Sequence, residues 1–312
     1  MNWLITGGAG YIGSHIAQLF HDEGLSYYCY DNLSSGLASR VPDQRRLIIG
    51  DINDETKFAS VIREFHISGV IHLAAKKSVE ESRIEPLLYE ETNFTATKNI
   101  LDACILGGIS HFIFSSTAAV YGESHLGYVV EDSKLLPISP YGETKLRAEN
   151  ILTSLINNGL IKGISLRYFN VIGQSKSLLR DESIDNLVPR VMSAIKANKR
   201  PQIYGSDYAT PDGTCIRDYV DVRDIAALHL SICKNFESVN LPTVLNVGTG
   251  NGVSVLEVMQ TIYSRLNLSF VPEFLPRRQG DPQTLVADIR KMKEELGFTA
   301  KFRFSDSIES LL

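Results

Sequence analysis

Short apolar runs alternate with longer helical stretches over the first 172 residues, and this alternation limits the possible folds more than any other feature. The apolar runs predict strands at Trp3–Thr6, Ser26–Tyr30, Leu47–Gly50, Val70–Leu73, Phe112–Ser115 and Ile164–Tyr168. The stretches between them predict helices at Ile12–Glu23, Thr56–Phe65, Leu87–Leu106 and Gly142–Asn157. Strands that alternate with helices favour right-handed crossovers, and strands covered on both faces are apolar throughout. We therefore predict an α/β fold with a doubly wound parallel sheet.

The regular alternation ends after residue 172. There the sequence predicts a polar loop at Gln174–Asp185, turns at Tyr204–Gly213, a strand at Val244–Val247, and helices at Asn186–Ala197, Asp221–Lys234, Ser254–Leu266 and Ile289–Leu296. We expect the helix at 221–234 and the strand at 244–247 to rejoin the parallel sheet. The remainder predicts a smaller lobe.

Composition excludes several classes of function. The 312 residues are 44% hydrophobic and 21% charged, with a formal net charge of −5, so the chain can bury a large core but has no basic excess for nucleic acid. No run of 18 apolar residues occurs, and we expect no membrane partner. The four cysteines, at positions 29, 104, 215 and 233, have no metal-ligand spacing. Unpaired thiols, and no room for a signal peptide before the first strand, favour a cytoplasmic protein without a bound metal.

A glycine triplet, Gly7-x-x-Gly10-x-x-Gly13, separates the first predicted strand from the first predicted helix. Glycines allow the backbone to approach a pyrophosphate closely, and the amides at the helix N-terminus can bind its charge. Asp31 follows the second strand, where a carboxylate can accept hydrogen bonds from ribose hydroxyls. Because that carboxylate would repel a 2′-phosphate, the pattern favours NAD over NADP. Asp51 is equally compatible with an adenine contact and with a loop residue or helix cap.

Tyr141 and Lys145 are four residues apart at the start of a predicted helix, so they share one face. A free tyrosine has a pKa near ~10, which a neighbouring ammonium or nicotinamide cation would lower towards that of a general base. Lys145 could also bind the nicotinamide ribose. Such pairs are often only surface pairs, but this one follows the fifth strand, where ligands bind in open α/β sheets. At the end of that strand we predict that Thr117 relays a proton, whereas Ser116 is compatible with a local hydrogen bond.

With these residues the chain resembles the UDP-galactose/UDP-glucose 4-epimerases of the extended short-chain dehydrogenase/reductase superfamily. The resemblance covers nearly the whole chain. In the first half it rests on residues 7–15, 31–36, 73–82, 115–122, 139–145 and 166–170. In the second half it rests on residues 208–220 and on residues 277–282, which include Gln279. The two later segments are much more specific than the glycine loop.

The resemblance implies NAD as the cofactor and a UDP-sugar as the substrate, with Tyr141 as the base, Thr117 as the relay and Lys145 beside them. It implies NAD contacts from Gly7, Gly10, Tyr11, Ile12, Gly13, Asp31, Asn32, Ser35, Asp51, Ile52, Leu73, Ala74, Ala75, Lys77, Asn93, Ser115, Tyr141, Lys145 and Phe169. It implies UDP-sugar contacts from Lys77, Thr117, Tyr141, Asn170, Asn186, Leu187, Tyr204, Arg217, Arg278, Asp281 and Leu285.

General chemistry agrees for Arg217 and Arg278, because a guanidinium can bind a diphosphate through a planar fork of donors. Solvated surface arginines are the alternative. Tyr204 could stack on uracil or belong to the core. The implied reaction is a transient oxidation: a hydride from the sugar passes to NAD⁺, the 4-keto sugar turns about its diphosphate link, and hydride returns to the other face. NAD should therefore stay bound, and binding should be tight at UDP and loose at the hexose.

Two departures from the family pattern bear on the substrate. Gln174 stands where a small residue is usual, and the loop up to Asn186 is shorter and more charged than usual. Leu285 stands where members restricted to hexoses carry a bulky tyrosine. We hypothesise that UDP-N-acetylglucosamine and UDP-N-acetylgalactosamine also fit, which would be wrong if UDP-N-acetylglucosamine neither bound nor turned over.

Three alternatives compete with this hypothesis. Dehydratases of the same fold place Asp-Glu after the threonine, where this chain has Ala118 and Ala119, which cannot transfer protons. A UDP-uronate epimerase is compatible with the pattern. A non-catalytic NAD-binding protein is disfavoured because the Tyr–Lys pair and both arginines are present.

The resemblance also implies an organisation. We expect a Rossmann-type NAD-binding domain from residues 1–172 plus 220–247, and an α/β UDP-sugar-binding lobe from residues 173–219 plus 248–312. The active site would lie in the cleft between them. The family usually forms homodimers through the helices predicted at Leu87–Leu106 and Gly142–Asn157.

Overall fold

A seven-stranded parallel sheet forms the larger part of the computed structural model, which describes residues 1–123, 127–238, 240–278 and 280–312. Its strands are β1 (Trp3–Thr6), β2 (Tyr27–Asp31), β3 (Leu47–Ile49), β4 (Gly69–His72), β5 (His111–Thr117), β7 (Lys162–Tyr168) and β11 (Val244–Val247). They lie in the order β11-β7-β5-β4-β1-β2-β3, and every pairing is parallel. The predicted doubly wound sheet is confirmed, including the return of β11 to its edge.

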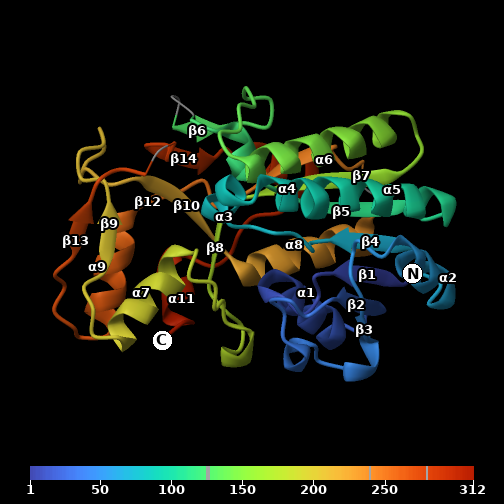
Figure 1. The fold of residues 1–312 in the computed structure, drawn as a ribbon, viewed down its shortest axis with the longest axis horizontal. Helices are drawn as coiled ribbons and strands as arrows, with labels where there is room; N and C mark the ends of the chain where they lie inside the picture. Colours follow the sequence, from blue (N-terminus) through green and yellow to red (C-terminus); the bar gives the residue numbers. More distant parts are fainter. Residues whose placement is uncertain (124–126, 239, 279) are drawn as a thin grey trace.

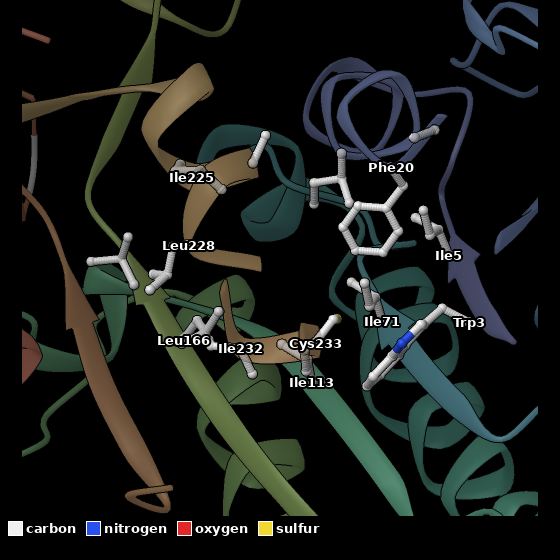
Figure 2. Packing of buried hydrophobic residues seen from close by; sticks show 14 of the residues in the cluster. Trp3, Ile5, Phe20, Ile71, Ile113, Leu166, Ile225, Leu228, Ile232 and Cys233 are labelled. Atoms are coloured by element: carbon white, nitrogen blue, oxygen red, sulfur yellow. The ribbon is translucent and has the colours of Figure 1, made fainter. Parts of the chain in front are cut away.

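Helices cover both faces of this sheet (Figure 1). The elements α1 (Tyr11–Asp22) and α8 (Val222–Asn235) pack on one face, and α2 (Glu55–Glu64), α5 (Ala96–Leu106) and α6 (Pro140–Asn157) pack on the other. Figure 2 shows Phe20 of α1 and Leu228 of α8 packed over strand residues such as Ile71 and Ile113. Helix α8 lies far along the chain from α1 but shares its apolar core, because both bury one face on the same strands.

The helix predicted at Leu87–Leu106 is not a single α-helix. It consists of α4 (Pro86–Tyr89), a π-helical turn η3 (Glu90–Thr95) and α5, and it is preceded by α3 (Val79–Ile84). The Ser78 hydroxyl accepts the Glu81 amide at 3.2 Å and thereby begins α3. Pro86 occupies the first turn of α4, where the missing amide costs nothing.

Short strands build a second, smaller sheet around β10 (Ile216–Asp221). It pairs with β8 (Asn170–Ile172), β12 (Gly252–Ser254) and β14 (Thr284–Ala287), and β14 pairs with β6 (Tyr128–Val129). The remaining elements are β9 (Gln202–Tyr204), paired with β13 (Glu273–Leu275), and α7 (Leu187–Lys196), α9 (Val255–Arg265), α10 (Arg290–Leu296) and α11 (Phe304–Glu309). The prediction of turns from Tyr204 onwards was wrong at its first residue, because Tyr204 ends the short strand β9, which lacks the continuous apolar run that marked the parallel strands.

The smaller sheet crosses the predicted domain division, since β6 and β8 come from residues assigned to the first lobe. The division of the chain into two domains therefore stays a prediction. All four cysteines are free and buried. Within the part of the chain that the structure describes, no helix is long and apolar enough to cross a membrane.

Replacing Leu228 by alanine tests whether α8 belongs to the core of the large sheet. Leu228 is fully buried, so Leu228→Ala should lower the free energy of unfolding by about 2–5 kcal/mol. Leu160 is 55% exposed, and Leu160→Ala should change the free energy of unfolding by no more than about 0.5 kcal/mol. Urea unfolding of both variants measures the difference. Equal effects would contradict the packing of α8 described here.

Candidate active site

One cavity of about 1520 Å³ collects nearly all of the predicted site residues. It runs along the carboxyl ends of the parallel strands and continues over residues of the smaller sheet, including Arg217 and Leu285. Every residue predicted to contact NAD or the UDP-sugar lines this cavity except Asn93. Gln279, part of the last motif, lies outside the described residues.

The glycine loop forms a cradle that larger residues would fill. Gly7 has a φ of +70°, and a Cβ atom on it would lie 2.9 Å from the amide nitrogen of Ala74. A Cβ atom on Gly13 would lie 2.2 Å from the carbonyl oxygen of Gly7. Gly10 provides no side-chain cap for α1, so the first amides of the helix stay available to phosphate oxygens. These residues fit the pyrophosphate of a dinucleotide.

Asp31 lies at the end of β2, next to this loop. Its carboxylate accepts the amide of Ala9 at 2.9 Å and that of Leu33 at 2.8 Å. These two bonds fix the carboxylate and leave lone pairs for ribose hydroxyls, as NAD requires. Asp51 accepts the Asn53 amide and the Asn32 side chain, and both lower the pKa of the carboxyl. Asp51 therefore organises its own turn and also lines the cavity.

Asn93 does not reach the cavity. It is fully buried in the π-helical turn, where its side chain accepts the amide of Lys76 at 2.8 Å and donates to the carbonyl of Lys76 at 2.9 Å. These two hydrogen bonds hold the loop that follows β4. The side chain therefore positions this loop, and the implied contact between Asn93 and NAD stays a prediction.

Tyr141, Thr117 and Lys145 lie together, as predicted. Tyr141 lies in the first turn of α6, which Ser139 caps by accepting the amide of Gly142 at 3.2 Å. Burial raises the pKa of Tyr141, and a hydrogen bond with Thr117 lowers it. Thr117 is thus in place to exchange a proton with the phenol.

Lys145 does not lower the pKa of Tyr141 in the way that the sequence suggested. Its ammonium donates to the carbonyl oxygen of Ser115 at 2.9 Å, and burial lowers the pKa of Lys145 to about 7. Burial therefore dominates both groups and favours the neutral form of each. Positive charge beside Tyr141, such as that of a nicotinamide bound in the cavity, would favour its phenolate.

Glu149 and Arg167 were not predicted from the sequence, but they fix α6 in place. Glu149 lies one turn beyond Lys145 on the same face and forms an ion pair with Arg167 of β7, with both side chains 3% exposed. Glu149 also accepts the hydroxyl of Ser116 at 2.7 Å, and Arg167 donates to the hydroxyl of Tyr121 at 2.8 Å. The available signal was the spacing of residues 141, 145 and 149 along one helix face.

Two arginines, Arg217 and Arg278, also line the cavity, and Arg217 of β10 lies opposite Leu285 of β14 in the register of the smaller sheet. Arg217 is 8% exposed and donates to Asp281 at 2.6 Å. Arg278 stacks on Tyr204, with 3.9 Å between the guanidinium carbon and the ring centroid. The Nε of Arg278 makes no hydrogen bond, and its ion pair with the Glu80 carboxylate is long, with 3.4 Å between nitrogen and oxygen. A guanidinium held this loosely keeps donors for a phosphate group.

The charged loop before α7 borders the middle of the cavity. Its Asp181 forms an ion pair with Lys77, with 3.6 Å between nitrogen and oxygen, and accepts the side-chain amide of Asn186 at 2.5 Å. Lys77 and Asn186, both predicted to bind ligand, thus contact the carboxylate of Asp181. Sequence reasoning identified this loop as unusual but assigned Asp181 no role.

Apolar residues border the catalytic end. Leu285 of β14 is 7% exposed and belongs to one buried cluster with Phe169 and Ala118. Ala118 and Ala119 follow Thr117 directly in the helical turn η4 (Ala118–Tyr121). Neither alanine can supply a proton, so Tyr141 and Thr117 are the groups in place for proton transfer there.

Comparisons with known proteins agree over the whole chain. The sequence model of the NAD dependent epimerase/dehydratase family matches residues 3–248. A UDP-glucose 4-epimerase of Azospirillum brasilense is 36% identical over 309 residues, which cover 98% of this chain and 89% of the relative. The solved UDP-glucose 4-epimerase from Stenotrophomonas maltophila, with bound NAD and formylated UDP-arabinopyranose, has a TM-score of 0.94 at 33% identity and covers 100% of this chain and 96% of its own. The UDP-Glc/GlcNAc 4-epimerase from Campylobacter jejuni has a TM-score of 0.86 at 36% identity, with coverage of 99% and 97%.

Replacing Asp31 by alanine should weaken NAD binding by about ten- to a hundredfold, because hydrogen bonds from the ribose to a fixed charge are lost. Discrimination against NADP should fall as well. Calorimetric titration with each dinucleotide measures both effects. Asp43 also accepts a backbone amide, that of Arg45 at 3.1 Å, but lies outside the cavity, so Asp43→Ala is the matched control. Equal affinity of the Asp31→Ala variant and wild type would contradict the ribose contact.

Proposed function

The chain belongs to the NAD-dependent epimerase/dehydratase family and to its UDP-sugar 4-epimerases, and from that premise we propose that it interconverts UDP-glucose and UDP-galactose. The carrying observation is that one cavity brings together two kinds of group. A proton-transfer pair, Thr117 and Tyr141, and two arginines, Arg217 and Arg278, line the same cavity. An epimerase needs both, because it must hold UDP firmly while the sugar turns over.

The residues divide the work as follows. Arg217 and Arg278 bind the diphosphate. Tyr204 stacks on the side chain of Arg278, and in this proposal its ring also stacks on the uracil. Tyr141 takes the proton of the sugar 4-hydroxyl with Thr117 as relay, and later returns it. Bound NAD⁺ supplies a reversible hydride acceptor and a positive charge beside Tyr141. Asp31 and the glycine loop hold it.

Lys145 has an orienting role in this proposal. Its ammonium is fixed by the carbonyl and hydroxyl oxygens of Ser115, at 2.9 and 3.4 Å, and it keeps further donors for the nicotinamide ribose. Burial lowers the pKa of Lys145 to about 7. Lys145 therefore acts in this proposal by positioning the dinucleotide.

We propose that N-acetylhexosamine nucleotides are also substrates. Leu285 is smaller than tyrosine and lies beside Phe169 at the catalytic end of the cavity. The similarity to a UDP-Glc/GlcNAc 4-epimerase supports the same range. The sugar therefore meets an apolar wall that leaves room for a 2-acetamido group.

A homodimer is part of the proposal. Leu87 of α4 and Leu106 of α5 are 82% and 90% exposed, on the helices through which the family pairs. The division into an NAD-binding domain and a UDP-sugar lobe is proposed on the same basis. Cross-linking or ultracentrifugation of the purified chain would test the dimer.

A turnover assay without added NAD tests the proposed function. UDP-galactose and UDP-N-acetylgalactosamine are offered separately, and their 4-epimers are quantified. We expect UDP-galactose to turn over on retained cofactor and UDP-N-acetylgalactosamine to follow. If neither turns over, even with added NAD, the UDP-hexose assignment is wrong.

The pH dependence of turnover should depend on Thr117. Its hydrogen bond lowers the pKa of Tyr141, so Thr117→Ala should raise that pKa and move the alkaline rise of kcat/KM to higher pH. The rate at neutral pH should fall about a hundredfold or more, the usual contribution of acid–base catalysis. Thr117→Ser keeps the hydroxyl and should keep the wild-type profile. An unshifted profile for Thr117→Ala would contradict the relay.

Leu285→Tyr should separate the two groups of substrates. The larger ring should reduce turnover of UDP-N-acetylgalactosamine about ten- to a hundredfold, the cost of overfilling a packed site, and spare UDP-galactose. Leu285→Met conserves volume and should leave the ratio unchanged. The ratio of kcat/KM values is the measurement. An equal loss for both substrates would mean that Leu285 does not border the sugar.

A further inference from the structure

The segment at residues 173–186, between β8 and α7, borders the cavity that the dinucleotide cradle also lines, and we call it the strap. It is the charged loop that departs from the family pattern. Gln174 and residues 180–186 line the cavity, and the only helical turn in the strap is η5 (Ser177–Leu179). In Figure 1 the strap descends from β8 towards the N-terminal elements. Its contacts show what holds it there.

Arg40 is the main anchor of the strap. It ends the turn η1 (Ala38–Arg40), which follows β2, and it is only 5% exposed. Its guanidinium donates to the carbonyl oxygens of Leu178 and Arg180, at 3.3 and 2.8 Å, and lies 3.4 Å from the Glu182 carboxylate. One buried side chain thus holds three successive points of a segment about 140 residues away.

Two further anchors come from neighbouring strand ends. After β1, the hydroxyl of Tyr11 donates to the carbonyl of Gly173 at 2.6 Å, and the ring of His15 accepts the amide of Ser175 at 3.1 Å. After β4, Lys77 forms its ion pair with Asp181 of the strap. The strap is therefore fixed to the ends of β2, β1 and β4, which lie side by side in the sheet.

These three strand ends also carry the dinucleotide cradle, with the glycine loop after β1 and Asp31 at the end of β2. The strap and the cradle thus border the same cavity, so a segment fastened there can limit the exit of a bound dinucleotide. We propose that Arg40 is a positioning residue that retains NAD by fastening the strap over it. The proposal rests on the NAD dependence of the family and not on the identity of the sugar.

Retention follows from the chemistry of the anchor. Separating Arg40 from its acceptors exposes two carbonyls and leaves a buried guanidinium unpaired, so strap opening is costly. Leu179 adds an apolar anchor, since it is 2% exposed, whereas its neighbour Leu178 is 53% exposed. An enzyme whose cofactor ends each cycle unchanged gains from such closure, because released NAD would have to be rebound.

The test measures bound NAD directly. Wild type and Arg40→Met are purified without added NAD, their NAD content is determined by absorbance after acid release, and the dissociation rate is followed by dilution into an NAD-trapping enzyme. We expect wild type to retain NAD and Arg40→Met to release it about tenfold faster or more, the factor for one charge-assisted hydrogen bond. Arg40→Lys, which keeps the charge but not the fork, should lie between them.

Two controls separate the strap from general destabilisation. Arg46 is also partly buried and donates to the carbonyl of Tyr27 at 2.9 Å, but it lies outside the cavity, so Arg46→Met should retain NAD. Leu179→Ala loosens the strap and leaves Arg40 intact, so it should release NAD faster, whereas Leu178→Ala should not. The comparison of Leu179→Ala with Leu178→Ala also tests the strap if Arg40→Met does not fold.

Two results would overturn the proposal. Retention of NAD by both Arg40→Met and Leu179→Ala would show that the strap does not limit release. Faster release from Arg40→Met but not from Leu179→Ala would show that Arg40 contacts the cofactor itself. With added NAD, Arg40→Met should recover turnover with an unchanged KM for the sugar, as expected for an effect confined to the cofactor. The NAD content of wild type is measured before that of any variant. Wild type that purifies with no NAD would count against the cofactor assignment and against its retention by the strap.

Discussion

A buried ion pair between Glu149 and Arg167 supports the arrangement on which the site depends. Burying two charges is costly, and here further bonds from Ser116 and Tyr121 offset that cost. The pair joins α6 to β5 and β7. Since Tyr141 is on α6 and Thr117 ends β5, the same contacts fix the distance across which the proton relay operates.

Burial has opposite consequences for the two catalytic groups. It raises the pKa of Tyr141 and lowers that of Lys145 to about 7, so the protein alone favours two neutral side chains. A phenolate is favoured only when positive charge lies nearby. The charge of a bound cofactor would therefore favour the phenolate of Tyr141. A strap that keeps the cofactor bound agrees with this dependence.

The residues that line the cavity differ in how firmly they can hold a ligand. Arg217, which is buried, and Arg278, which is partly exposed, provide cationic donors, and Tyr204 adds a stacking surface. Leu285 and Phe169 form an apolar surface with few directional bonds. Firm binding at the diphosphate and loose binding at the sugar allow the sugar to present both faces to one hydride acceptor.

Local pattern in the sequence determined the parallel sheet, the glycine cradle, Asp31 and the pairing of Tyr141 with Lys145, because each depends on near neighbours or on strand order. It missed the strands of the smaller sheet, including the six-residue β10, because these are not apolar throughout as the parallel strands are. It also missed the π-helical turn that interrupts the helix predicted at Leu87–Leu106. Only the tertiary structure decided the roles of Arg40, Asp181 and Glu149. Their partners lie far along the chain or on other elements, and burial fixes those pairings only after the strands have assembled.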